Sequence, residues 1–292
     1  MPTHSLIIPP EMEGRSIRSV ALHAIGMSSG QFKRAEFQGN LMLDGVRVTA
    51  DVRVKAGQQL ELHVPDIAGS KPETLDIPLH IVYEDEYLYV IDKPAPLPSA
   101  PSTRRDTPTL ENALYTQLGC PDSFVYRPVN RLDKGTSGLM IVAKDAHIQY
   151  LLQNILHTDH FIREYLAVVD GCPPHDEGVI DLPIAKADGA TVRREVRPDG
   201  KEARTFYRVL RRGQRSLVRL RLDTGRTHQI RVHMAHLGCP VTGDFLYGTE
   251  IPDIPMRFAL HSAMIALTHP ITGRVMTLES ELPQALQGLM EG

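Results

Sequence analysis

The chain has 292 residues, of which 42% are hydrophobic and 23% are charged, and its formal net charge at pH 7 is -3. This length allows one large domain or two ordinary domains, and the composition is that of a soluble globular protein. No run of 18 apolar residues is present, and the first residues lack the basic, apolar and small-residue order of a signal peptide, so neither a membrane span nor secretion is expected. Cys120, Cys172 and Cys239 stand singly, without disulfide or metal-ligand spacing, which indicates a reducing, cytoplasmic protein.

Residues 13–65 are predicted to form a small α+β domain. A helical period runs through residues 14–22, and a second, capped helix follows at 28–37. The Asp-Gly pair at 44–45 stands between two apolar runs, which is a strong hairpin signal. An alternating strand at residues 60–64 ends the pattern.

This order of a helix pair and a small hairpin resembles the αL RNA-binding module first named for a small-subunit ribosomal protein. The resemblance is carried by the second helix, with Ser29, Gln31, Lys33 and Arg34, and by the Leu-Asp-Gly-Val-Arg-Val segment of the hairpin. It implies that Lys33 and Arg34 contact RNA. A generic small α+β cap is the alternative interpretation.

Residues 66–78 are predicted to be a linker, because glycine, serine, lysine and proline are frequent there and apolar residues are few. A second domain then occupies residues 79–292. Strands outnumber helices in it without regular alternation, so we expect an α+β domain on a mixed, largely antiparallel sheet. The expected strands lie at residues 81–91, as a pair around an acidic turn, and at 138–143, 164–169, 203–210 and 217–222, and the expected helices lie at 146–157 and 227–237.

One carboxylate in the second domain has an unusual setting. Asp133 follows Arg131 and Leu132, and it precedes a Gly-Thr-Ser-Gly turn and the apolar run 139–143. A carboxylate held between a guanidinium and a tight turn is fixed in place, and loops braced by strands often carry chemistry. For an isolated motif of this kind, the alternative is a surface Arg-Asp pair at a strand entry.

Three enzyme classes with similar local sequences do not fit. Ion-pumping ATPases phosphorylate an aspartate in the order Asp-Lys-Thr-Gly-Thr, whereas Gly and Thr are exchanged here and no transmembrane helices are expected. The Gly-Thr-Ser-Gly segment lacks the Gly-x-Ser-x-Gly spacing of a nucleophile elbow. A retaining glycosidase needs two carboxylates that flank one sugar, and only Asp133 has a suitable setting.

The segment 223–234 predicts a helix with an anion site at its start. Thr227 is placed to cap this helix. His228 and Arg231 are three residues apart and therefore share a helix face, and Arg226 stands just outside the amino terminus. Two arginines and a histidine at a helix start can bind a phosphate or a carboxylate of the same protein.

Arginines are concentrated between residues 204 and 233. Nine arginines there stand against a single acid, Asp223, which gives a local net charge of +8. Lysine is absent from this stretch, and arginine is preferred where phosphate is bound by a planar, bidentate contact. The stretch suggests a nucleic-acid groove that includes Arg204, Arg219 and Arg221, and a solvated strand face is the alternative.

Six ordered motifs in the second domain form a recognisable set. They are Arg131-Leu-Asp-x-x-Thr-Ser-Gly-Leu, Glu164-Tyr-Leu-Ala-Val-Val-x-Gly, Gly200-Lys-x-Ala-x-Thr, Thr224-Gly-Arg-Thr-His-Gln-Ile-Arg-Val-His-Met, Gly243-Asp-x-x-Tyr-Gly, and Leu260-His with Thr268-His-Pro. With them the chain resembles the RluA-type pseudouridine synthases, specifically the subgroup with an αL module in front. Asn130 stands where that family usually has histidine, and Pro96 where many relatives have glycine. Neither departure changes the aspartate, so they concern substrate detail and loop geometry rather than activity.

The resemblance implies that uridine in RNA is isomerised to pseudouridine: the C1′–N1 bond breaks and C1′ is joined to C5. This requires no redox change and no external energy, so neither a cofactor nor a metal is expected. By analogy, Asp133 attacks the base or the sugar, or removes a proton from the sugar. Arg231 matches the arginine that pairs with this carboxylate. Tyr165 matches the ring that stacks on the target base and serves in proton transfer at C5.

A uridine inside folded RNA must leave its stack, at a cost of roughly a few kcal/mol. Arg131 matches the family residue that enters the vacated space, Leu260 is expected on the apolar side of the pocket, and Arg226 and His228 are expected to contact the substrate. RNA is therefore the expected partner of a monomer, with ribosomal RNA favoured and transfer RNA as the alternative. The alternative function is a catalytically silent RNA-binding or ribosome-assembly factor on the same fold, an interpretation that Asn130 keeps open.

Overall fold

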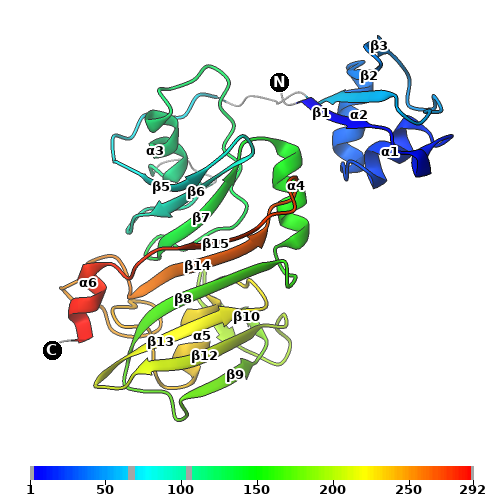
Figure 1. Cartoon of the computed structure of the whole chain (residues 1–292). Coiled ribbons are helices and arrows are strands. Elements are labelled where there is room, and N and C mark those ends of the chain that lie inside the picture. The colour runs from blue at the N-terminus through cyan, green and yellow to red at the C-terminus, as the bar shows by residue number, and fades with distance from the viewer. Residues whose placement is uncertain (1–2, 65–69, 103–106, 291–292) are drawn as a thin grey trace.

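The protein consists of two units with separate hydrophobic cores, a small N-terminal unit and a larger domain (Figure 1). The structure is a computed structural model that describes residues 3–64, 70–102 and 107–290. No helix within these three ranges is both long and apolar enough to cross a lipid bilayer.

The N-terminal unit combines two helices with a four-stranded antiparallel sheet of order β1-β4-β2-β3. Its elements are β1 (Thr3–Ile7), α1 (Ile17–His23), α2 (Ser29–Phe37), β2 (Leu41–Leu43), β3 (Val46–Arg47) and β4 (Gln59–His63). Ser28 caps α2 by accepting a hydrogen bond from the Gln31 backbone N–H at 3.2 Å, and the Gln31 side chain accepts one from the Ser28 N–H at 2.8 Å. The predicted helix pair and hairpin are confirmed, and β1 extends the sheet to residues before 13.

The larger domain is built on one sheet of nine strands in the order β5-β6-β7-β14-β8-β13-β12-β9, with β15 beside β14. Only the β7–β14 pair is parallel, so the predicted mixed, largely antiparallel sheet is confirmed. The strands are β5 (His80–Glu84), β6 (Leu88–Lys93), β7 (Ser137–Ala143), β8 (Phe161–Asp170), β9 (Glu177–Asp181), β12 (Arg204–Arg211), β13 (Arg215–Leu222), β14 (Leu260–Thr268) and β15 (Val275–Glu279).

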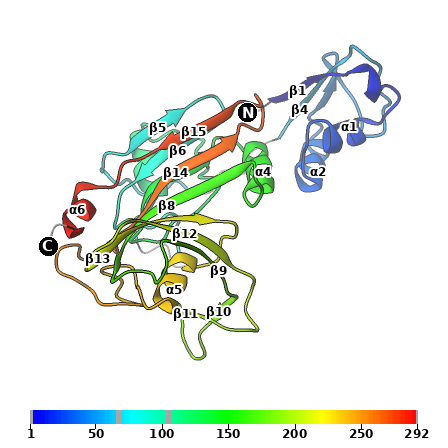
Figure 2. The same cartoon turned by 60° about the horizontal axis from the view of Figure 1, so that its bottom comes forward.

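Helices cover this sheet in separate places. They are α3 (Leu110–Gln117), α4 (Ala146–Ile155), α5 (Gln229–His236) and the short α6 (Gln284–Gln287), and a ribbon of β10 (Ile184–Lys186) and β11 (Arg194–Val196) lies beside α5. Figure 2 shows α5 against the half of the sheet that contains β12 and β13. All seven residues of β7 are buried because both of its faces are covered, which explains its uninterrupted apolar sequence.

The N-terminal unit contacts the larger domain at α4. The ring of His4 meets the ring of His147 edge-on, with centroids 4.4 Å apart. Gly26 lies so close to α4 that a Cβ atom there would be 3.1 Å from Cδ2 of Leu151. Burial lowers the pKa of His147 to about 4, and the neighbouring His4 acts in the same direction. The contact therefore favours an uncharged His147.

We predict that acid weakens the folded protein through His147. Between pH 6.5 and pH 4 the unfolded chain binds a proton at this ring that the folded protein excludes, so the free energy of unfolding falls as the pH falls through this window. In His147→Gln, the midpoint of urea unfolding should fall less as the pH is lowered. His175→Gln, a substitution of an exposed histidine, should show the same fall as the wild type. An identical pH profile for all three proteins would contradict this role of the contact.

Candidate active site

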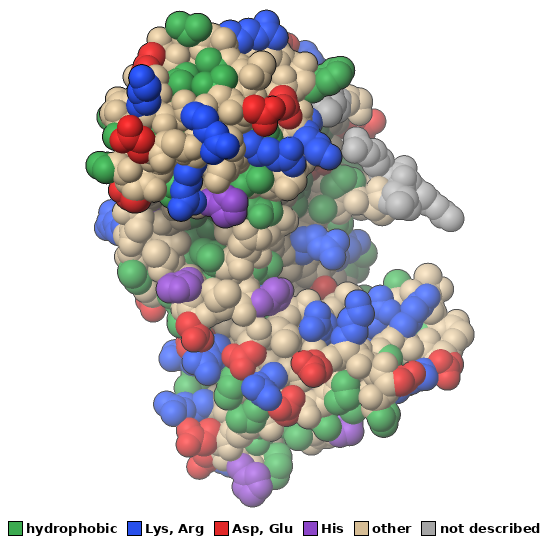
Figure 3. All heavy atoms as spheres, turned by 90° about the vertical axis from the view of Figure 1, so that its right-hand side faces the viewer, with side chains coloured by type: hydrophobic (Ala, Val, Ile, Leu, Met, Phe, Trp, Pro, Cys, Tyr) green, Lys and Arg blue, Asp and Glu red, His purple; other side chains and the backbone are tan. Residues whose placement is uncertain are grey.

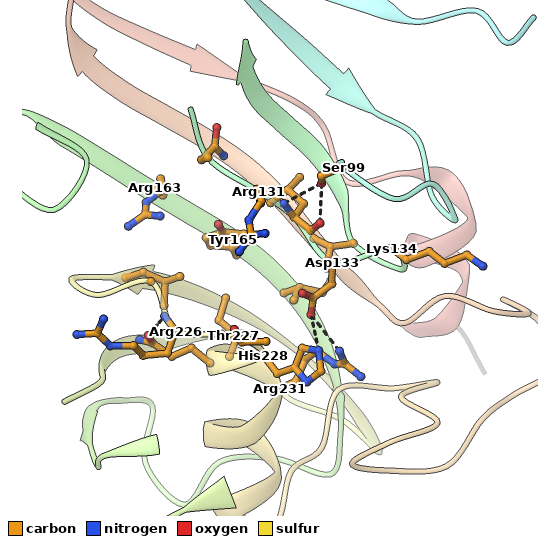
Figure 4. A pocket seen from close by; sticks show the side chains of 18 of the residues that line it. Ser99, Arg131, Asp133, Lys134, Arg163, Tyr165, Arg226, Thr227, His228 and Arg231 are labelled. Atoms are coloured by element: carbon orange, nitrogen blue, oxygen red, sulfur yellow. Dashed lines mark hydrogen bonds and ion pairs between the residues drawn. The ribbon is translucent and has the colours of Figure 1, made fainter. Parts of the chain in front are cut away.

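Seven of the predicted site residues line one pocket of about 520 Å³ in the larger domain. The pocket lies between the loop before β7, the first half of β8 and the segment that leads into α5 (Figure 4). The seven are Arg131, Asp133, Tyr165, Arg226, His228, Arg231 and Leu260. Among the described residues, no group of three or more His, Cys, Asp or Glu side chains is arranged to hold a metal ion.

The loop that carries Asp133 is held in place by hydrogen bonds to its main-chain atoms. The hydroxyl of Ser99 donates a hydrogen bond to the Leu132 carbonyl at 2.6 Å, and the Leu132 N–H donates to the same hydroxyl at 3.0 Å. The Thr136 N–H donates to the Asp133 carbonyl at 3.1 Å and closes the turn. These bonds leave the Asp133 side chain directed into the pocket and 30% exposed.

Arg231 links Asp133 to a second, fully buried carboxylate. Its Nη1 donates to Asp133 Oδ2 at 3.0 Å, while Nε and Nη2 donate to the two carboxylate oxygens of Asp244 at 2.6 and 2.8 Å. The guanidinium also lies 4.1 Å from the ring centre of Phe258. Burial by itself would lower the pKa of Arg231, but Asp244 and Asp133 together raise it. The arginine is thus a fixed positive charge beside Asp133.

His228 lies next to Arg231 and approaches the same oxygen of Asp133 (Figure 4). Its Nε2 is 3.9 Å from Asp133 Oδ2, and its Nδ1 is 2.8 Å from the hydroxyl of Tyr247. The backbone of His228 is left-handed, with φ of 59°, and His228 is the N-cap residue of α5. Burial lowers the pKa of His228, although Asp133 acts in the opposite direction. The prediction that Thr227 caps this helix is wrong, because the left-handed residue moves the helix start to Gln229.

Tyr165 and Leu260 form the apolar side of the pocket. Tyr165 is on β8, paired with Leu220 of β13 and Ser262 of β14, and Leu260 at the start of β14 is paired with Ala167. Both side chains are buried. Burial raises the pKa of Tyr165, so its hydroxyl is protonated at neutral pH.

Several pocket residues were not predicted from the sequence. Ser99, His157 and Arg163 line the pocket, Asp244 fixes Arg231, and Lys93 is fully buried nearby. Burial lowers the pKa of Lys93 to about 7, and its Nζ donates to the carbonyls of Pro94 and Leu97 at 2.9 and 2.7 Å. Asp244 was contained in the Gly243-Asp motif, so a signal for it was present, whereas Arg163 has no sequence signal of its own.

Asn130, which stands where the family usually has histidine, connects two parts of the main chain. Its Oδ1 accepts a hydrogen bond from the Ile141 N–H at 2.9 Å, and the side chain is buried. This bond attaches the start of the Asp133 loop to the middle of β7. Asn130 is therefore engaged with the main chain, while Asp133 and Arg231 remain paired.

The residues predicted to bind RNA lie outside this pocket. Arg219 and Arg221 line a second groove of about 470 Å³, together with Phe206 and Tyr207. Arg204 pairs with Asp181 at 2.6 Å, and other arginines of the 204–233 stretch pair with acids of neighbouring segments, namely Arg208 with Glu177, Arg212 with Asp176 and Arg219 with Glu164. The local charge of +8 is therefore partly neutralised by acids that are distant in sequence. Lys33 and Arg34 are exposed on α2 of the N-terminal unit.

We predict that Asp244→Asn lowers the free energy of unfolding by about 3–5 kcal/mol, because it removes the main partner of a buried guanidinium. Urea denaturation measures this loss. Asp188→Asn is a matched control, since Asp188 pairs with Arg197 at the surface and an exposed pair contributes little. Equal effects of the two substitutions would contradict the role given to Asp244.

Comparison with known proteins assigns the chain to a family. Residues 87–236 match the family model described as RNA pseudouridylate synthase. The uncharacterized RNA pseudouridine synthase YjbO of Bacillus subtilis is 38% identical over 261 residues, which cover 87% of this chain and 90% of that protein. Ribosomal large subunit pseudouridine synthase D of Pseudomonas aeruginosa is 38% identical over 301 residues, with coverage of 95% and 91%.

A solved structure agrees at the level of the fold. Human RNA pseudouridylate synthase domain containing 4 superimposes with a TM-score of 0.58 and 24% identity, covering 72% of this chain and 92% of that one. The sequence relatives carry the assignment further, because they are more than 30% identical over most of the chain. The protein belongs to the RNA pseudouridylate synthase family, in its RluA-type branch, and is an isomerase that acts on RNA.

Proposed function

We propose that the protein isomerises a uridine of ribosomal RNA, with Asp133 as the carboxylate that acts on the nucleotide. The observation that carries this proposal is the position of Asp133, directed into the pocket and fixed at 3.0 Å by the buried Arg231. Two similar proteins, from Xanthomonas campestris and Pseudomonas aeruginosa, are named ribosomal large subunit pseudouridine synthase D, which favours ribosomal RNA. Transfer RNA is the alternative substrate.

The pocket provides what the isomerisation needs. The C1′–N1 bond breaks, the base turns, C1′ joins C5, and the proton of C5 is lost while N1 gains one. Asp133 attacks the base or the sugar, or takes a proton from the sugar, and Arg231 orients it. Tyr165 is the ring on which the base stacks, and we assign it a part in the transfer of the C5 proton. Accepting that proton requires the phenolate, which burial disfavours by raising the pKa of Tyr165. Leu260 closes the apolar side.

The substrate uridine has to leave the RNA stack to reach Asp133. Arg131 is exposed on the rim of the pocket, where it fits the proposed role of entering the vacated space. We assign contact with the bound nucleotide to Arg226 and His228. Figure 3 shows the surface hollowed between the N-terminal unit and the lower part of the larger domain, with Lys and Arg side chains on both sides of the hollow.

RNA outside the pocket is proposed to contact two further surfaces. The N-terminal unit would act as the αL module, through Lys33 and Arg34 on its second helix. The second groove would add phosphate contacts from Arg219 and Arg221, with Arg204 nearby on the same stretch. Such contacts tolerate any sequence and weaken steeply as salt rises. The protein would work as a monomer in the cytoplasm, which agrees with its free cysteines.

Asp133→Asn should abolish turnover while RNA affinity is preserved, because the two side chains have nearly the same size. Turnover is measured as tritium release from RNA labelled at C5 of uridine, since C5 loses its hydrogen only when it becomes bonded to the sugar. Unmodified ribosomal and transfer RNA are compared side by side to identify the substrate class. A fully active mutant would refute the mechanism. Salt-sensitive RNA binding by the wild type without any release would favour the silent RNA-binding or assembly factor.

Arg131→Ala should reduce turnover on folded RNA more than it reduces binding, because it removes the side chain that replaces the extruded base. An unstructured RNA that contains the same uridine serves as the control, and its turnover should change little. The cost of extrusion, roughly a few kcal/mol, sets the upper limit of the difference between the two RNAs. Equal rates on folded RNA before and after the substitution would exclude the extrusion role.

A further inference from the structure

A buried arginine without a carboxylate partner lies at the end of the pocket away from Asp133. Arg163 is 5% exposed, and it shares a face of β8 with Tyr165, two residues further along the strand. Its Nη2 is 3.4 Å from both the Leu156 carbonyl and Nδ1 of His157, which are long contacts, and its Nε has no hydrogen-bond partner among the described residues. A buried guanidinium in a folded protein is normally paired.

A second arginine, Arg226, and the ring of His157 lie near this guanidinium. Arg226 also lines the pocket (Figure 4), and its Nε donates to the Glu202 carbonyl at 2.8 Å. Burial lowers the pKa of His157, and Arg163 and Arg226 lower it further. Two acids, Asp159 and Asp223, line a neighbouring cavity together with His157, and Asp223 is 4.0 Å from Nη1 of Arg204. His157 is therefore uncharged at neutral pH, and among the described residues neither Arg163 nor Arg226 forms an ion pair with a carboxylate.

The backbone of Gly225 packs closely against His157 and Arg163. A Cβ atom on Gly225 would lie 3.0 Å from Cε1 of His157, and 3.5 and 3.8 Å from the two terminal nitrogens of Arg163. Any side chain at this position would therefore occupy the space beside the guanidinium. Gly225 is itself exposed, so an anion from outside can reach that space.

We propose that Arg163 and Arg226, beside the ring of His157, form a subsite for a backbone phosphate of RNA, next to the nucleotide that enters the pocket. This inference rests on the proposed RNA substrate. Arg163 and Tyr165 are separated by two residues of strand, roughly 7 Å, so a base stacked on Tyr165 has its flanking phosphate within reach of Arg163. An anionic phosphate oxygen would accept from the terminal nitrogens of the guanidinium, the contact for which arginine is suited, whereas Nε lies below the surface.

The site itself is tested without turnover, by thermal unfolding in sodium phosphate and in sodium chloride of equal ionic strength. Phosphate should raise the unfolding temperature of the wild type more than that of Arg163→Gln, because a ligand of the folded state stabilises it. Without phosphate, Arg163→Gln should unfold at the same or a higher temperature, since it removes an unpaired buried charge. An equal response to phosphate in both proteins, or a large loss of stability in its absence, would show that Arg163 has only a structural role.

The second experiment measures KM and kcat on the RNA that tritium release identifies as the substrate. Arg163→Gln should raise KM about tenfold to a hundredfold with kcat changed little, and the slope of log KM against log salt should fall by about 0.7–0.9. Gly225→Ala, which fills the space and keeps every charge, should raise KM in the same way, and Arg163→Lys should recover part of the loss. Arg274→Gln, on an exposed arginine that lines neither groove, is the matched control.

A final comparison identifies the phosphate. RNA carrying a single neutral methylphosphonate is tested at each linkage flanking the modified uridine. At one linkage, the methylphosphonate should weaken RNA binding by the wild type. The same substitution should not weaken binding by Arg163→Gln any further, because the two changes remove the same contact. Additive losses at every linkage would refute an RNA phosphate as the ligand, even if free phosphate binds. Absence of tritium release from any RNA would instead refute the proposed function, and the thermal comparison would still decide the subsite.

Discussion

The active site depends on one buried guanidinium that is shared between two carboxylates. Arg231 takes both oxygens of Asp244 with two of its nitrogens and reaches Asp133 with a third. Asp133 and Arg231 are 98 positions apart in the chain, so this contact exists only when the β7 loop and α5 are both in place. Because an unpaired buried charge is costly, the interaction connects the stability of the domain with the orientation of Asp133, the proposed catalytic side chain.

The order of the strands brings the remaining groups to the same pocket. β14 lies between β7 and β8, so Leu260 at its start and Tyr165 on β8 come next to the loop that carries Asp133. The antiparallel β8–β13 pair continues the sheet toward β12, against which α5 packs. Tyr165 is thus held within the sheet and Asp133 in the loop before β7, whereas Arg131 is exposed on the rim of the pocket.

The sequence predicted features that depend on neighbours in the chain. The hairpin at Asp44-Gly45 and the capped α2 follow from local turn and capping chemistry, and the buried β7 follows from an uninterrupted apolar run. The strands β9, β14 and β15 were not predicted. Their sequence patterns are short or mixed, so which side of each strand is buried can be assigned only when its partner strands are known.

The site was predicted unevenly for the same reason. Asp133, Tyr165 and Arg231 were identified by resemblance to a family, since residue type alone gave Tyr165 no function. The start of α5 was misplaced because a left-handed His228 has no local sequence signal. The acids that neutralise much of the 204–233 stretch, such as Glu177 and Asp181, belong to another strand. That Arg163 has no carboxylate partner among the described residues is visible only in three dimensions.

The most direct test of the central claim, that an extruded uridine enters the pocket at Asp133, is a structure of the Asp133→Asn protein bound to its RNA substrate. We predict one uridine outside its stack, with its ring on Tyr165 and its C1′ facing residue 133. The adjoining phosphate should lie at Arg163. A uridine that remains paired, or RNA that follows the second groove while the pocket stays empty, would contradict the claim.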